Sequence, residues 1–314
     1  MTTQTGFKGC KVRKFERLAL RTFKAPNLRT PQASNACHFQ IGVVPVTLRC
    51  VHGPTMRAFR EVYAPYRLDD PHPEAIQIEV VRASDRLRPW NRFEVWADGV
   101  RRYSFGRAKS CLPRVEWAIN WQIMHYLPRF FEVHAGVMEV GGQGVIFPAV
   151  SGSGKSTLVT ALLARGWRYL SDEFALIDPD SLLLHPYPKA ICLKEGSFPV
   201  LDRLGHVVER SRVHAHPRKG AVTFVDPHRL GDVGREPCAI RHVIFCQYVE
   251  DRPPAIRALS RAEAVLRLNA QSFNFGKFKT RGVRILCDVV RGARCYELRS
   301  GDIEETCGLV RRSI

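Results

Sequence analysis

Hydrophobic and polar positions follow different patterns in the two parts of this chain. Between residues 36 and 113 the apolar runs are short and rich in Val, Ile, Phe and Trp, which favours strands. The clearest strand segments are 39–51, 74–83 and 92–106. In the last of these, Ala-Asp-Gly at 97–99 separates two alternating runs, as is typical of a hairpin. Residues 55–66 are expected to form a short helix. The pattern predicts a small β-rich α+β domain over residues 36–113.

A longer helix over residues 114–131 is predicted to connect this domain to the rest of the chain. Its apolar positions at helical spacing include Val115, Ala118, Ile119 and Ile123. Trp117 and Trp121 are four residues apart and therefore share one face of the helix. We interpret these two tryptophans as part of a core stripe rather than as a ligand cage.

The rest of residues 114–314 alternates between predicted strands and helices, which is typical of an α/β domain. Strands are expected at 131–140, 144–150, 167–172 and 239–248, and a hairpin at 174–188. Helices are expected at 155–166, 260–273, 278–290 and 302–312, the last one capped by Asp302. Residues 211–224 are basic and lack apolar periodicity, so they are predicted to form an exposed loop. Three interpretations stay open: Arg218 and Lys219 neutralise charge at the phosphates, they bind an acidic substrate, or the loop is simply a solvated charged segment.

Composition and charge narrow the class of protein. The 314 residues carry a net charge of +18, but the basic residues are spread along the chain without a nucleic-acid-binding motif, so nucleic acid is not the expected partner. Residues 1–35 form a basic stretch that is predicted to be a flexible tail. The ten cysteines form no C-x-x-C pair, and Cys246 and Cys287 lie in apolar runs as expected for buried thiols. Free thiols and the absence of an apolar run of membrane-spanning length predict a cytoplasmic protein.

Candidate chemistry begins at residues 149–157, which read Ala-Val-Ser-Gly-Ser-Gly-Lys-Ser-Thr. This segment lies between a predicted strand and a predicted helix, the context that a phosphate-binding loop requires, although Ala149 stands where the full pattern has glycine. Glycines allow successive N–H groups to point at phosphate oxygens. The residues predicted to bind the phosphates are Ser151, Gly152, Ser153, Gly154, Lys155, Ser156 and Thr157, with the Ser156 hydroxyl also on Mg²⁺.

Two acids follow at a spacing that has a geometric meaning. Asp172 and Glu173 stand at the end of the strand that follows the predicted helix. A right-handed crossover makes that strand parallel to the strand before the loop, so its carboxyl end returns beside the phosphates. One acid is then placed to help hold Mg²⁺, and the other to accept a proton from an attacking hydroxyl.

These motifs resemble the bacterial HPr serine kinase/phosphorylase family, and more closely the HPr-kinase-related proteins called HprK-related kinase A. The blocks that carry the resemblance are EWAINW at 116–121, FPAVSGSGKST at 147–157 and RGWRYLSDEFALID at 165–178. The resemblance implies a phosphate-loop fold related to phosphoenolpyruvate carboxykinase, and transfer of the γ-phosphate of ATP to a serine hydroxyl. The family signature that follows in HPr kinases is not recognisable here, which weakens the case for HPr itself as substrate.

The resemblance also implies roles for individual residues. Asp172 matches the catalytic base of the family, Glu173 replaces a second aspartate, and His134 matches a histidine near the transferred phosphate. Glu195 matches a glutamate that helps to hold Mg²⁺, so the implied metal ligands are Ser156, Glu173 and Glu195. The family also assembles as oligomers, which makes a homo-oligomer an expectation.

The resulting hypothesis is an ATP- and Mg²⁺-dependent kinase in which Lys155 holds phosphate and Asp172 takes the proton of the acceptor. The acceptor is expected to be a serine or threonine of a protein or a ribosomally made peptide. Two alternatives stay open: a nucleotide-sensing regulator that transfers nothing, and a kinase that acts on a small molecule.

Overall fold

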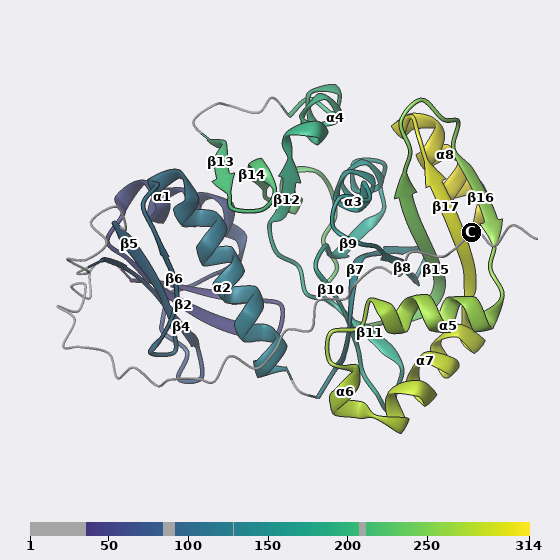
Figure 1. The fold of residues 1–314 in the computed structure, drawn as a ribbon, viewed down its shortest axis with the longest axis horizontal. Coiled ribbons are helices and arrows are strands. Elements are labelled where there is room, and N and C mark those ends of the chain that lie inside the picture. The colour runs from purple at the N-terminus through teal and green to yellow at the C-terminus, as the bar shows by residue number, and fades with distance from the viewer. Residues whose placement is uncertain (1–35, 84–91, 128, 207–211) are drawn as a thin grey trace, which may run out of the picture.

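The computed structural model describes residues 36–83, 92–127, 129–206 and 212–314. The basic tail predicted for residues 1–35 lies outside these ranges. The chain forms a mixed α/β protein with a strand-rich N-terminal half, and Figure 1 shows this half beside the half that contains the larger sheet. Within the described ranges, no helix combines the length and the apolar character needed to cross a membrane.

The N-terminal half is a six-stranded sheet with two helices. Its strands are β1 (Ala36–Ile41), β2 (Val44–Cys50), β3 (Arg67–Leu68), β4 (Ile76–Arg82), β5 (Phe93–Ala97) and β6 (Val100–Phe105), in the order β3-β1-β2-β4-β5-β6. The predicted hairpin is confirmed, since Asp98 and Gly99 both have positive φ and join β5 to β6. The strand-rich segment 39–51 contributes to two strands, which form a hairpin that turns at Gly42, where φ is +59°.

Helix α1 (Gly53–Val62) and helix α2 (Cys111–Tyr126) share a core with this sheet. The prediction that α2 runs over 114–131 is wrong at both ends. Leu127 leaves the helical region, because it precedes Pro128 in the sequence and such residues disfavour helix, and Phe131 already begins a strand. The expected apolar stripe is buried. However, Trp117 and Trp121 are only half-buried, so their assignment to the core stripe is also wrong.

The second sheet has eight strands and mixed directions. They are β7 (Phe131–Val140), β8 (Gln143–Pro148), β9 (Arg168–Ser171), β10 (Phe174–Ile177), β11 (Leu183–His185), β15 (Cys238–Tyr248), β16 (Ala255–Ala258) and β17 (Arg294–Ser300). The order is β11-β10-β7-β8-β15-β17-β16, with β9 paired to β7. Strands β8, β15 and β17 are parallel neighbours. β9 runs parallel to β8 as predicted, since both are antiparallel to the intervening β7.

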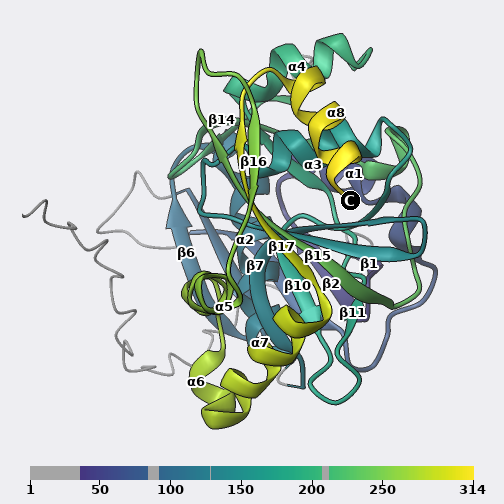
Figure 2. The same ribbon diagram turned by 90° about the vertical axis from the view of Figure 1, so that its right-hand side faces the viewer.

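Helices cover both faces of this sheet (Figure 2). On one face α3 (Lys155–Leu163) and α8 (Ile303–Ser313) share a core with sheet residues such as Phe147. On the other face α5 (Arg261–Ala270) and α7 (Thr280–Gly292) pack on residues such as Ile146, with α6 (Phe275–Phe278) beside them. Asp302 caps α8 as predicted, by accepting the N–H groups of Glu304 and Glu305.

A third, smaller sheet lies between the two halves (Figure 1). It consists of β12 (Ile191–Lys194), β14 (Gly220–Val225) and β13 (His214–His216), and α4 (Phe198–Arg203) follows β12. The prediction that 211–224 is an exposed loop is therefore wrong for its described part. Val222 and Phe224 are two residues apart and both enter the core, while Nδ1 of His216 accepts the N–H groups of Arg218 and Lys219 and closes the turn.

The two halves share one hydrophobic core and one buried ion pair. Phe174 and Tyr187 belong to the same cluster as the apolar residues of the N-terminal sheet. Nζ of Lys189 lies 2.7 Å from a carboxylate oxygen of Glu116 and 2.8 Å from Oδ1 of Asn120, both on α2. Helix α2 is thereby fixed to the segment that leads into β12.

The described cysteines are free thiols. Cys246 is buried, as expected from its apolar run, whereas Cys287 on α7 is only half-buried.

Candidate active site

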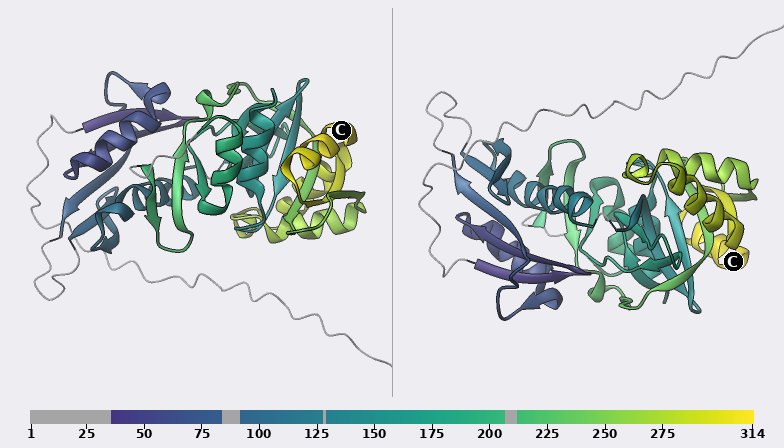
Figure 3. Two further views of the ribbon diagram at one scale, coloured as in Figure 1. Left: turned by 90° about the horizontal axis from the view of Figure 1, so that it is seen from above. Right: turned by 90° about the horizontal axis from the view of Figure 1, so that it is seen from below.

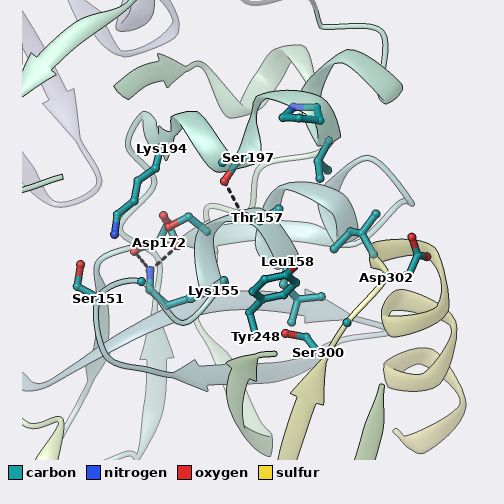
Figure 4. Close-up of a pocket in the computed structure, with 18 of the residues that line it drawn as sticks. Ser151, Lys155, Thr157, Leu158, Asp172, Lys194, Ser197, Tyr248, Ser300 and Asp302 are labelled. Atoms are coloured by element: carbon teal, nitrogen blue, oxygen red, sulfur yellow. Dashed lines mark hydrogen bonds and ion pairs between the residues drawn. The ribbon is translucent and has the colours of Figure 1, made fainter. Parts of the chain in front are cut away.

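A large cavity lies where several strands of the second sheet end. Its volume is about 730 Å³. Ser151 follows the end of β8, Asp172 follows β9, Tyr248 ends β15 and Ser300 ends β17, and all four residues line the cavity. Ligands in α/β proteins bind at the carboxyl ends of parallel strands, so the cavity has the position expected of a binding site. Figure 4 shows Lys155, Thr157 and Leu158, from the start of α3, among the residues that line it.

The loop between β8 and α3 is held in a conformation that requires glycine. Gly152 and Gly154 have φ values of +98° and +84°, and a Cβ on Gly154 would lie 3.0 Å from Cβ of Tyr248. The N–H of Tyr248 donates to the carbonyl of Ser153 at 2.9 Å, which ties the loop to β15. The N–H groups of the first helical turn, beginning at Lys155, have no acceptor within the helix. Loop and helix thus present N–H groups and the positive end of a helix dipole to the cavity.

Lys155 and Asp172 form a buried ion pair (Figure 4). Nζ of Lys155 lies 2.5 Å from Oδ1 of Asp172 and also donates to the Asp172 main-chain carbonyl. The two residues are only 6% and 3% exposed. The close approach depends on Gly136 of β7, where a Cβ would lie 2.5 Å from Cγ2 of Val159 on α3. The crossover expected from the spacing of the two residues therefore brings Asp172 back to the loop.

Glu173 and His134 form a second polar pair on the cavity wall. Nε2 of His134 lies 4.0 Å from Oε2 of Glu173. Burial, and then the charge of Lys155, lower the pKa of His134 to about 4, so this imidazole is neutral at neutral pH. Burial alone would raise the pKa of Glu173, but the charges of Lys219, Lys189 and Lys155 outweigh it and lower the pKa to about 2.

Lys219 reaches the cavity from the turn between β13 and β14. Burial opposes its charge, but Glu173 together with Cys192, Asp172 and Glu116 outweighs burial and raises the pKa of Lys219. This ammonium therefore stays protonated on the cavity wall.

Most of the residues predicted for phosphate binding line the cavity. They are Ser151, Gly152, Gly154, Lys155, Ser156 and Thr157. Ser153, in the same loop, is buried and does not line the cavity. Glu195, proposed as a metal ligand, is exposed and also does not line it. The preceding residue, Lys194, enters the cavity instead and points toward the Lys155–Asp172 pair (Figure 4).

Several lining residues were not predicted from the sequence. Lys194 ends β12, and Ser197 shares a 2.6 Å hydrogen bond with Thr157 at the start of α3. Tyr248 ends β15, and Arg252 lines the cavity from the segment that follows this strand. Their positions depend on strand ends that meet only in the folded chain. Tyr248 had a local signal, because it ends a long buried strand and a ligand site is expected at such an end.

No protein-family model matches this chain, and no curated protein matches its sequence. Among solved structures, the chain is similar to the Hpr(Ser) kinase/phosphatase from Coxiella burnetii, with 15% sequence identity and a TM-score of 0.29. The match covers 58% of this chain and 95% of that chain. At this TM-score no residue of one chain can be matched to a residue of the other, so any function has to be inferred from the cavity itself.

Proposed function

We propose that this protein is an ATP- and Mg²⁺-dependent kinase that phosphorylates a hydroxyl group, that of a serine or threonine in a protein or peptide. The observation that carries the proposal is the buried contact between Lys155 and Asp172, beside a loop whose two glycines have positive φ and which leads into the N-terminus of α3. The lysine in such a loop, here Lys155, binds phosphate, and the carboxylate of Asp172 is within reach of a phosphate bound there. We accordingly propose a phosphate-loop fold of the HPr kinase type.

The cavity fits a nucleoside triphosphate. Its volume of about 730 Å³ lies within the range of small-molecule sites. A Cβ at Gly152 would approach Nζ of Lys194 to 3.4 Å, and one at Gly154 would approach Tyr248, so side chains there would fill the space where phosphate oxygens lie. Lys155 and Lys194 supply positive charge on the same side. We propose that residues 151–157 hold the phosphates.

The residues present also fit Mg²⁺. No group of three acidic, histidine or cysteine side chains in the described ranges is arranged as a metal site. Mg²⁺ at phosphates needs no such group, since one or two carboxylates together with phosphate oxygens and water complete its shell. We propose Ser156 and Glu173 as the protein ligands, because both line the cavity, and we exclude Glu195 because it is exposed away from it.

Bound ATP with Mg²⁺ supplies the phosphoryl group. Asp172 accepts the proton of the attacking hydroxyl. For this, Lys155 must leave its ion pair with Asp172 and contact phosphate instead. Lys219 faces the same space and stabilises negative charge that develops during transfer. His134 is neutral and offers a hydrogen bond without adding charge. Asp172 follows the end of β9, Lys219 stands in a closed turn and His134 lies within β7, so each group is held by the backbone around it.

The test compares wild type with Lys155→Ala and Asp172→Asn, using γ-labelled ATP, Mg²⁺ and desalted lysate fractionated by size. Label on a protein or peptide with wild type alone is the expected result, and acid-stable phosphoserine or phosphothreonine identifies the acceptor. Label only in the small-molecule fraction would replace the peptide acceptor with a metabolite. Nucleotide binding without transfer to either fraction would instead leave a nucleotide sensor.

A further inference from the structure

Six side chains outside the cavity form a layered surface, here called the arginine–aromatic surface. They are Arg102 and Tyr103 of β6, Arg114, Trp117 and Trp121 of α2, and Arg218 of the turn between β13 and β14. The rings of Tyr103 and Trp117 stack at 5.6 Å. Cζ of Arg218 lies 4.9 Å from the centre of the Trp117 ring, and Cζ of Arg102 lies 5.7 Å from that of Trp121. Arg114 lies over Tyr103 at 5.7 Å.

This surface begins where the cavity ends. His216 packs on Trp117 with ring centres 5.3 Å apart, and its Nδ1 accepts the N–H groups of both Arg218 and Lys219. Lys219 points into the cavity, whereas the neighbouring Arg218 lies on Trp117. Figure 3 shows the green hairpin that carries this turn between α2 and the larger sheet. One turn therefore joins the cavity to the surface.

The arginines of the surface are charged, and the only carboxylate among the described residues that acts on any of them is Asp98, which partly offsets the lowering of the Arg102 pKa by burial. Within the described part of the chain, Arg102, Arg114 and Arg218 take part in no ion pair, and Arg102 donates to the neutral amide of Gln122. A guanidinium stacked on a ring keeps its N–H donors in the ring plane available for a carboxylate. The stacking also restricts its side-chain motion, which lowers the entropy lost on binding.

We infer that the arginine–aromatic surface docks an acidic segment of the peptide or protein that is phosphorylated, an inference that rests on the proposed kinase function. Charge complementarity selects this occupant, because three unpaired guanidinium groups match carboxylates. A nucleic acid is disfavoured, since the rings of Tyr103 and Trp117 are already covered by each other and by guanidinium groups and are not free to stack on bases.

The geometry sets the length of the acidic segment. The path from the Arg218 guanidinium across Trp117 to Tyr103 is about 10 Å, which an extended peptide covers in about three residues. Because Arg218 adjoins Lys219 in one turn, the acidic residues are expected a few positions from the serine or threonine that enters the cavity past Lys219.

The test measures binding of labelled peptides to the full chain by fluorescence anisotropy, without nucleotide. Each peptide carries one serine and four glutamates that start two to five residues to either side of it, and a matched set carries glutamines. The variants are Arg218→Gln, Arg218→Lys and Arg241→Gln. Arg241 is a control of equal charge, because it is exposed near the start of β15 and the cavity lies at the other end of that strand. Circular dichroism checks that each variant is folded.

At least one glutamate peptide is expected to bind about tenfold more tightly than its glutamine counterpart. Arg218→Gln should weaken this binding about tenfold, as for one charge-assisted hydrogen bond, and Arg241→Gln less than about twofold. Arg218→Lys should lie between, because it keeps the charge and loses the planar stack. Equal binding of all glutamate and glutamine peptides, no binding at all, or equal effects of the two glutamine variants would overturn the inference. Displacement of the peptide by a 12-nucleotide single strand at lower concentration would overturn it in favour of nucleic acid.

Phosphate transfer to the same peptides separates this inference from the proposed function. Arg218-dependent binding with no transfer from ATP would refute the kinase and leave the docking surface intact. Transfer that is abolished by Asp172→Asn but shows no preference for glutamate would refute the docking surface alone.

Discussion

Replacement of Asp172 by asparagine should have opposite effects on nucleotide binding and on phosphate transfer. In the structure this carboxylate neutralises Lys155 at 2.5 Å, and both side chains are almost fully buried. A nucleotide phosphate has to compete with Asp172 for the same ammonium group. Asparagine keeps the shape of the side chain and removes its charge, so the competition is weakened while the proton acceptor is lost.

The magnitude follows from the geometry of the ion pair. Two unit charges about 4 Å apart attract by about 4 kcal/mol at the effective dielectric constant typical of protein sites. In wild type, Lys155 gives up this attraction to bind phosphate and recovers most of it from the phosphate charge. In Asp172→Asn nothing has to be given up, so the free energy of nucleotide binding should become more favourable by about 1 to 2 kcal/mol. That gain corresponds to roughly 5- to 30-fold tighter binding of ADP or ATP. Loss of a general base should lower the transfer rate by about 10²- to 10⁴-fold.

Titration with a fluorescent ADP analogue measures the first effect, and label transfer from ATP measures the second. Asp180→Asn is the matched control, because Asp180 is exposed and its ion pair with Arg281 lies away from the cavity. This control should bind nucleotide as wild type does. A folded Asp172→Asn variant that binds nucleotide no more tightly than wild type would refute the competition between carboxylate and phosphate. Undiminished transfer would refute the role of Asp172 as base.

Three further predictions concern stability. The pKa of His134 is lowered to about 4 in the folded chain, so the unfolded chain binds the proton first as pH falls below about 6.5. The free energy of unfolding therefore declines between about pH 6.5 and pH 4. In urea titrations the His134→Gln variant should lack this part of the decline, which is about 1 to 2 kcal/mol at pH 5. Gly136→Ala should cost about 1 to 3 kcal/mol, because its Cβ clashes with Val159, and the double variant Gly136→Ala/Val159→Ala should not show the two losses added together. Lys189→Met leaves Glu116 buried without its partner and should cost about 3 to 5 kcal/mol at pH 7 by the same titration, whereas a loss under about 1 kcal/mol would contradict the buried pair.

The sequence predicts the elements around Lys155 because each of them carries a local signal. Apolar runs define β7 and β8, the glycines at 152 and 154 define the loop, and Gly166 marks the end of the helical segment. The return of Asp172 then follows from the handedness of crossovers, which is a general rule and needs no knowledge of this chain. Local signals and one topological rule are thus sufficient for the floor of the cavity.

The walls of the cavity depend on long-range contacts that leave little local signal. In β12 the side chains of Cys192 and Lys194 are two positions apart and both face the cavity. Glu195 comes one position later, begins a short 3-10 helix and does not line the cavity. An error of one residue in the predicted register is therefore enough to place Glu195 in the cavity where the structure has Lys194. Trp117 and Trp121 show a different limit: their apolar rings favoured the core, although they lie off the buried stripe that contains Val115 and Ile119.

The bond from Lys189 to Glu116 and Asn120 has a consequence for how this chain could be divided or recombined. A fragment that started after α2 would keep the entire phosphate-binding loop, yet it would leave a buried ammonium group without its counter-ion and uncover Phe174 and Tyr187. The N-terminal half is therefore no detachable module. A chimaera that grafted another recognition domain onto this cavity would have to reproduce the Glu116 and Asn120 positions of its helix, four residues apart, before the cavity could fold beneath it.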